Sequence, residues 1–198
     1  ARLEYDTLLA GGQPASPKPA PEAPRPAAPS TPAAEPTTPR GAEFDKSRRD
    51  VDDLMRRATL ARFQTAIAGE FGSFEAVTQP GFEVAALPTA KFWSLRLPPR
   101  VLGKFVALVD GNAVADAWAL ASKMKKDVQR DLCVFLMGPA LASPTELAVA
   151  ITEQRKRPML AGGKLVLIPV STKDWSAHVP TDAPDVCKAL LARLKSKM

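Results

Sequence analysis

The sequence predicts an α/β fold, in which a small open sheet of about three parallel strands is extended by a strand pair. Three apolar runs, at residues 105–109, 132–137 and 165–170, are each followed by a helical pattern. Strands that alternate with helices of this length are typical of right-handed crossovers and a parallel sheet. An amphipathic helix and a Pro/Ala-rich linker precede them, so the predicted order is helix, strand pair and three strand–helix units.

The first 43 residues do not have the composition of a packed domain. We interpret residues 1–12 as a short apolar docking peptide or as the end of an upstream element. Residues 13–43 are a Pro/Ala-rich linker, because ten of the 28 residues from Gln13 to Arg40 are proline. Proline fixes φ and removes a backbone donor, so we expect a disordered, extended spacer. Residues 44–198 are expected to form a single α/β domain.

An amphipathic helix is predicted at residues 47–71. Ser47 followed by Asp50 resembles a capping box, so the helix is expected to begin there. Apolar side chains recur at spacings of three and four, which indicates one buried face, and the other face is rich in arginine. The apolar set is Val51, Leu54, Met55, Ala58, Ala61, Phe63, Ile67 and Phe71.

A strand pair is predicted next, at residues 82–87 and 92–97. The four residues between them suit a hairpin connection. The second run alternates apolar and polar side chains, which is typical of a strand with one wet face at a sheet edge. We therefore expect this pair to extend the parallel sheet, with an antiparallel strand in it.

The three strand–helix units differ in how their strands are buried. Residues 132–137 are apolar without alternation, which indicates a central strand covered on both faces. Residues 165–170 contain Pro169, which indicates that the strand lies at an edge or ends there. Ser143 to Glu146 forms a full capping box with proline at the first helical position. The helices are predicted at 113–126, 144–156 and 185–197.

A candidate ligand site lies where the three predicted strands end. In open α/β sheets, ligands bind outside the carboxyl ends of the strands. A helix N-terminus at Ser143 would attract an anion, and Lys173 would neutralise it. The alternative explanation of these residues is structural, as helix caps and loop residues. The candidate ligand-binding set is Asp110, Asn112, Ser143, Ser171 and Lys173.

Several kinds of chemistry lack their usual residues. The sequence has no Gly-x-Gly-x-x-Gly and no phosphate-binding loop for nucleotides. The single histidine, His178, and the two cysteines have no partners at metal-ligand spacing. A triad of Ser143, His178 and Asp110 lacks a Gly-x-Ser-x-Gly elbow. We therefore predict no catalytic residues, no metal and no cofactor, and an enzyme is the less favoured reading.

Charge and apolar runs bear on partners and compartment. The net charge of +6 is spread over several helices without interleaved aromatic residues, so nucleic acid is disfavoured as a partner. No apolar run approaches the length of a membrane span. Two cysteines are too few for a disulfide framework, and we expect reduced thiols in a cytoplasmic protein.

The leading hypothesis is a non-catalytic protein–protein interaction or scaffolding module, tethered by its linker in a larger, bacterial-style assembly. Its partner would be another protein or another part of a longer chain, with a homo-oligomer as a further alternative. The candidate partner surface consists of Phe92, Trp93 and Trp175. One alternative is a small-molecule-binding, anion-binding or enzymatic domain that uses the strand ends. A second is a basic nucleic-acid-binding domain.

Overall fold

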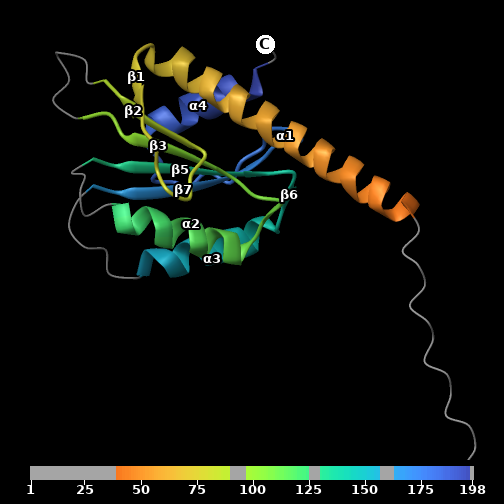
Figure 1. The fold of residues 1–198 in the computed structure, drawn as a ribbon. Coiled ribbons are helices and arrows are strands. Elements are labelled where there is room, and N and C mark those ends of the chain that lie inside the picture. The colour runs from red at the N-terminus through yellow and green to blue at the C-terminus, as the bar shows by residue number, and fades with distance from the viewer. Residues whose placement is uncertain (1–38, 90–96, 125–129, 157–162, 197–198) are drawn as a thin grey trace, which may run out of the picture. The chain divides into compact units, whose positions relative to one another are not determined.

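A five-stranded mixed sheet lies between two layers of helices in the computed structural model (Figure 1), which confirms the predicted α/β class. The structure describes residues 39–89, 97–124, 130–156 and 163–196. The helices are α1 (Pro39–Phe71), α2 (Gly111–Met124), α3 (Pro144–Lys156) and α4 (Asp185–Lys195). The strands of the main sheet are β1 (Phe74–Ala76), β2 (Val84–Pro88), β3 (Arg100–Phe105), β5 (Leu132–Gly138) and β7 (Leu165–Ser171). The predicted docking peptide and residues 13–38 of the predicted linker lie outside the described residues.

The strand order is β1-β2-β3-β5-β7. Strands β3, β5 and β7 are parallel, whereas β2 pairs antiparallel with both of its neighbours, β1 and β3. The central position predicted for residues 132–137 is confirmed, because β5 lies between two parallel neighbours and all its residues are buried. The edge position indicated by Pro169 is also confirmed, since β7 ends the sheet. A proline cannot donate to a ladder, and an edge strand needs no donor on its outer side.

The first parallel strand of the main sheet lies earlier in the chain than predicted, and of the strand predicted at 105–109 only Phe105 belongs to it. The strand that pairs with β5 is β3, and the chain leaves the main sheet after Val106, whose amide donates to the Met137 carbonyl at 2.9 Å. The rest of that apolar run forms β4 (Leu108–Val109), which pairs with β6 (Ala140–Leu141) in a second, two-stranded parallel sheet. Gly103 and Lys104 interrupt the apolar pattern of β3 and concealed it.

The structure describes only the first member of the predicted strand pair. Residues 82–87 correspond to β2, but β2 pairs antiparallel with β1 on one side and with β3 on the other. Residues 92–96 of the predicted second strand lie outside the described residues. Because β1 has only three residues, its sequence is too short to show the alternation that would predict a strand.

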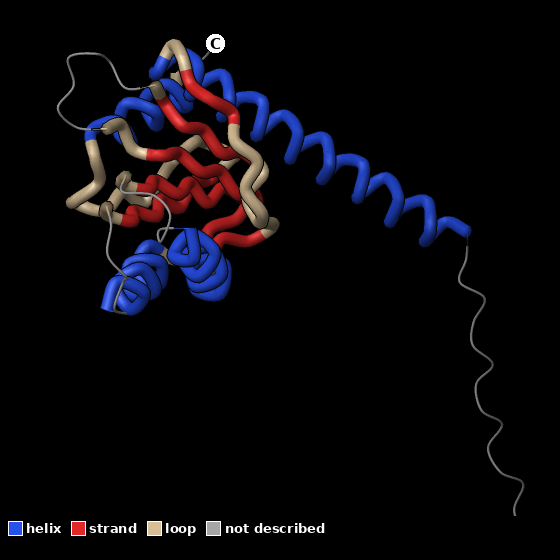
Figure 2. The backbone as a smooth tube through the Cα atoms, turned by 60° about the vertical axis from the view of Figure 1, so that its left-hand side comes forward, coloured by secondary structure: helices blue, strands red, loops and turns tan. Residues whose placement is uncertain are grey.

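Each face of the sheet has its own core and its own pair of helices (Figures 1 and 2). Helices α1 and α4 cover one face, where Phe63 packs on Phe135 with ring centroids 5.0 Å apart. Helices α2 and α3 cover the other, where Trp118 is buried.

The two cysteines, Cys133 and Cys187, are free, buried thiols. Their sulfur atoms lie 2.9 Å apart and form a hydrogen bond, which together with burial raises the pKa of Cys133.

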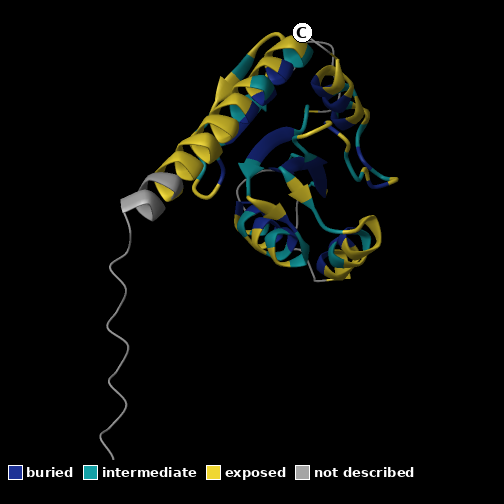
Figure 3. Ribbon diagram, turned by 90° about the vertical axis from the view of Figure 1, so that its right-hand side faces the viewer, coloured by how far each residue is buried: buried dark blue, intermediate teal, exposed yellow. Residues whose placement is uncertain are grey.

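Helix α1 begins earlier and is covered over less of its length than predicted. It starts at Pro39, so residues 39–43 belong to the helix rather than to the linker, and Ser47 does not cap it. Proline is tolerated in a first helical turn because its missing N–H has no partner there. In the second half Phe63, Ala66 and Ile67 are buried, whereas every residue from 45 to 58 is exposed (Figure 3).

Candidate functional site

A recess of about 410 Å³ lies at the carboxyl ends of β5 and β7, beside the start of α3. Its volume falls in the range of small-molecule sites, and like them it combines apolar walls with a few polar groups. The polar groups are two hydroxyls and one imidazole, from the last residue of β7 and from the segment that follows it. The lining residues are Leu141, Ala142, Pro144, Leu147, Ser171, Ser176, Ala177 and His178.

The segment after β7 folds back on its own strand. The Ser171 amide donates to the Ser176 carbonyl at 2.8 Å, and the His178 amide donates to the Pro169 carbonyl at 3.0 Å. Asp174 organises the turn, because its Oδ1 accepts from the amide and from the hydroxyl of Ser176 at 3.2 and 2.9 Å. Hydrogen bonds from the hydroxyls of Ser171 and Ser176 and from the Ser176 amide lower the pKa of Asp174 to about 2.

Trp175 completes this turn in a left-handed conformation, with φ at +57°. Such a backbone is uncommon for a bulky residue and is retained only where the surroundings enforce it. Here the side chain is 9% exposed, and the Arg62 guanidinium lies 4.9 Å from the ring centroid. The expectation that Trp175 is an exposed residue of a partner surface was therefore wrong. Its two companions in that prediction, Phe92 and Trp93, lie outside the described residues.

The predicted ligand-binding residues do not converge as a set. Asp110 caps α2, because its Oδ1 accepts from the Ala113 amide at 2.9 Å. Ser143 caps α3, because its hydroxyl accepts from the Glu146 amide at 3.2 Å. Asn112 and Lys173 are exposed and do not line the recess, which leaves Ser171 as the member of the set that does.

Two polar residues of the recess, Ser176 and His178, were not among the predicted ligand-binding residues. The turn brings them back over the end of β7, through the bridge between Val170 and Ala177. Because these two residues lie several positions beyond the end of β7, no pattern in the sequence predicted that the chain would return to the strand there. In the described part of the chain, no group of three or more His, Cys, Asp or Glu side chains is placed to hold a metal ion.

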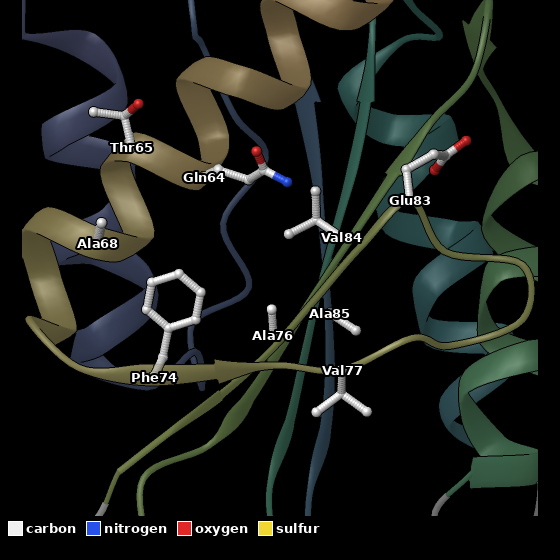
Figure 4. Close-up of a pocket in the computed structure, with 9 residues that line it drawn as sticks. All are labelled: Gln64, Thr65, Ala68, Phe74, Ala76, Val77, Glu83, Val84 and Ala85. Atoms are coloured by element: carbon white, nitrogen blue, oxygen red, sulfur yellow. The ribbon is translucent and has the colours of Figure 1, made fainter.

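A second recess, of about 470 Å³, lies between α1 and the β1–β2 side of the sheet (Figure 4). Glu83 lies on its rim and joins the two layers. One carboxylate oxygen accepts from Arg56 on α1 at 2.7 Å, and the other accepts from the Phe105 amide on β3 at 3.1 Å. The recess is lined by Gln64, Thr65, Ala68, Phe74, Ala76, Val77, Glu83, Val84 and Ala85.

Among the residues that the structure describes, the largest exposed apolar side chains that adjoin one another lie on the first half of α1. Val51 is 58% exposed, Leu54 68% and Met55 42%. Their spacing of three and four places them on one stripe of the helix, which we call the α1 stripe. Leu54 lies nine residues, or two and a half turns, before Phe63, so it faces away from the core that Phe63 enters. The prediction that these three residues belong to the buried face was wrong, because α1 is exposed on all its sides from residue 45 to residue 58.

Single exposed apolar residues elsewhere, such as Val149 and Val179, need no explanation, but three adjacent ones do.

Comparison of the chain with protein-family models, with curated proteins and with solved structures finds no match. Among the described helices, none combines the length and the apolar character that crossing a membrane requires.

Acid is expected to release the turn at Asp174. The folded-state pKa of about 2 lies below the ordinary value of 3.8, so the contribution of Asp174 to stability is complete above that value and is lost as the pH falls towards 2. An NMR titration of the Ser176 amide should show a midpoint near pH 2, and Asp174→Asn should remove that transition. A midpoint near 3.8 for Asp174 would show that the hydrogen bonds are not formed in solution.

Proposed function

We propose that this domain is a non-catalytic protein–protein interaction module, and that the first half of α1 is its docking surface. The α1 stripe carries the proposal. Fully burying a side chain the size of Val, Leu or Met is worth about 1.5–3 kcal/mol, so three adjacent exposed ones are a substantial source of binding free energy. Helices with anchors at positions i, i+3 and i+4 are a recurring element of protein recognition.

The second half of α1 is anchored in a way that presents the first half. Arg56 pairs with Glu83, and Glu70 accepts from Arg193 of α4 at 2.8 Å. Arg62 donates to the carbonyls of Leu194 and Ser196 at the end of α4. A helix held on rigid neighbours loses less conformational entropy when it binds, so this anchoring favours association.

The charges of the same segment argue against the nucleic-acid alternative. Arg48, Arg49, Arg56 and Arg57 would form a basic face on their own. Asp50, Asp52 and Asp53 lie between them on the same stretch of exposed helix. Phosphate binding needs an uninterrupted positive surface, because each aspartate opposes the release of counterions from the nucleic acid.

A photo-reactive benzoylphenylalanine at position 54 tests the proposal directly. In cells, the probe in place of Leu54 should cross-link to a specific protein, whereas the probe in place of Val149 should not. Val149 is the matched control because it is 57% exposed but lies alone on α3. With the cross-linked protein purified, Leu54→Glu should weaken binding about tenfold or more, and Val149→Glu less than about twofold. Equal effects of the two variants, or no specific cross-link from position 54, would exclude this surface.

The recess at the strand ends supports a second candidate function, the binding of a small molecule. The observation that favours it is the convergence of Ser171, Ser176 and His178 on one apolar-walled recess. An NMR screen of small polar aromatic and aliphatic compounds should shift the amides of Ala177 and Leu147, and Ser176→Ala should weaken those shifts. Compounds that shift only surface amides would count against this site.

A further inference from the structure

We infer that the partner of the α1 stripe is a second copy of this chain, and that two copies of the first half of α1 pair antiparallel. This inference rests on the proposed function and names the partner. In an antiparallel pair, Val51 of each copy faces Leu54 of the other, and Ala58 faces Ser47. The small side chains at the two ends of this contact allow the helices to approach closely.

The order of charges along α1 favours this arrangement. Asp50 directly precedes Val51, and Arg57 directly precedes Ala58. Because they are seven residues apart, the two charges lie on the same flank of the stripe. Both are exposed, and neither forms a salt bridge with another described residue. In an antiparallel pair, Asp50 of each copy lies beside Arg57 of the other, which gives two symmetric ion pairs.

A parallel pair in register would gain no such contact. Flanking positions then meet five residues apart in sequence, as in parallel coiled coils. Asp50 would lie beside Met55 of the other copy, and Arg57 beside Arg62. The first contact pairs a charge with an apolar side chain, and neither contact gives an ion pair. Since such flanking charges set orientation in helix pairs, the antiparallel arrangement is preferred.

The contact is small, because each copy contributes three large apolar side chains. Association costs translational and rotational freedom, and only the surplus appears as affinity. The dissociation constant is therefore expected to be on the order of tens of micromolar. Arg56 takes no part, since its guanidinium is engaged by Glu83 on the side of α1 that faces the sheet.

Charge reversal with the full-length chain tests the inference by sedimentation velocity, over concentrations from about 5 to about 500 μM. Asp50→Arg alone and Arg57→Asp alone each place like charges at both ion-pair positions, so each should weaken self-association about tenfold. A mixture of the two single variants restores opposite charges at both positions. It should associate within about threefold of the unaltered chain, as should the double variant.

Arg49→Asp is the matched control. Arg49 and Arg57 both lie four residues from Asp53, so reversing either one makes the same change of charge beside that aspartate. Arg49, however, lies two residues from Val51 and therefore on the opposite side of the helix. Arg49→Asp should leave self-association unchanged, and an effect equal to that of Arg57→Asp would overturn the proposed pairing.

Two other results would overturn the inference. If the unaltered chain stays monomeric at all concentrations, the stripe does not pair with its copy. The proposed function would then still stand if position 54 cross-links to a different protein. If the unaltered chain is monomeric but a variant lacking residues 1–12 dimerises, the apolar segment of the same chain covers the stripe instead.

Discussion

Phe63→Ala is expected to lower the free energy of unfolding by about 3–5 kcal/mol, the usual cost of removing a buried phenylalanine ring. The ring of Phe63 is fully buried, contacts Phe135, and is the main side chain through which α1 enters the core. Its removal leaves a cavity between α1 and the sheet that its neighbours cannot fill. Chemical denaturation monitored by circular dichroism measures the loss.

The matched control for Phe63→Ala is Leu54→Ala, on the same helix. Leu54 is mostly exposed, so its truncation should change the stability of the monomer by no more than about 0.5 kcal/mol. The pair of variants thus separates the two halves of α1. If Leu54→Ala costs as much as Phe63→Ala in dilute solution, Leu54 is buried against the rest of the chain and is not free to bind a partner.

Gly103→Ala is expected to lower the free energy of unfolding by about 2–3 kcal/mol, because it overpacks the same contact. A Cβ at this position would lie 2.6 Å from the Cε1 of Phe63 and 3.2 Å from the Cε of Met137. The Phe63 ring is enclosed on all sides and cannot move aside without shifting α1. The absence of a side chain on β3 is therefore what allows α1 to lie close to the sheet.

Gly111→Ala is the control for the glycine substitution itself. Gly111 is the first residue of α2, and a Cβ there would meet only the Cβ of Ala150, at an ordinary 3.7 Å. This variant should be neutral or stabilising by up to about 1 kcal/mol, since alanine restricts the unfolded chain more than glycine does. A Gly103→Ala variant as stable as Gly111→Ala would mean that α1 does not pack on β3 as described.

The elements that the sequence predicted best are those whose local signals agree with their surroundings. The unbroken apolar run of β5 reflects burial on both faces, and Pro169 marks an edge strand. Helix α3 begins at Pro144, where its capping box places it. The position of β3 was missed because Gly103 interrupts its apolar pattern. A glycine is needed there because Phe63 of α1 packs against it, and no local sequence pattern shows such a tertiary contact.

The functional surfaces were less predictable for the same reason. Helical periodicity showed that Val51 and Leu54 share a stripe, but not whether another element covers that stripe. Trp175 was expected to contribute to a partner surface, yet its strained turn directs the indole into the core beside Arg62. Only Ser171 of the predicted ligand-binding set reaches the recess, because the other polar residues are used as helix caps or face solvent.

Hydrogen–deuterium exchange along α1 tests the central claim most directly. In dilute solution, the amides of residues 45–57 should exchange much faster than those of residues 60–70, because an exposed helical segment with few tertiary contacts opens readily. Concentrating the chain, or adding the cross-linked partner, should slow exchange at 45–57 by about tenfold, and Leu54→Glu should prevent that change. Equal protection of both halves in dilute solution, unaffected by concentration, partner or Leu54→Glu, would contradict the assignment of this helix as an interaction surface.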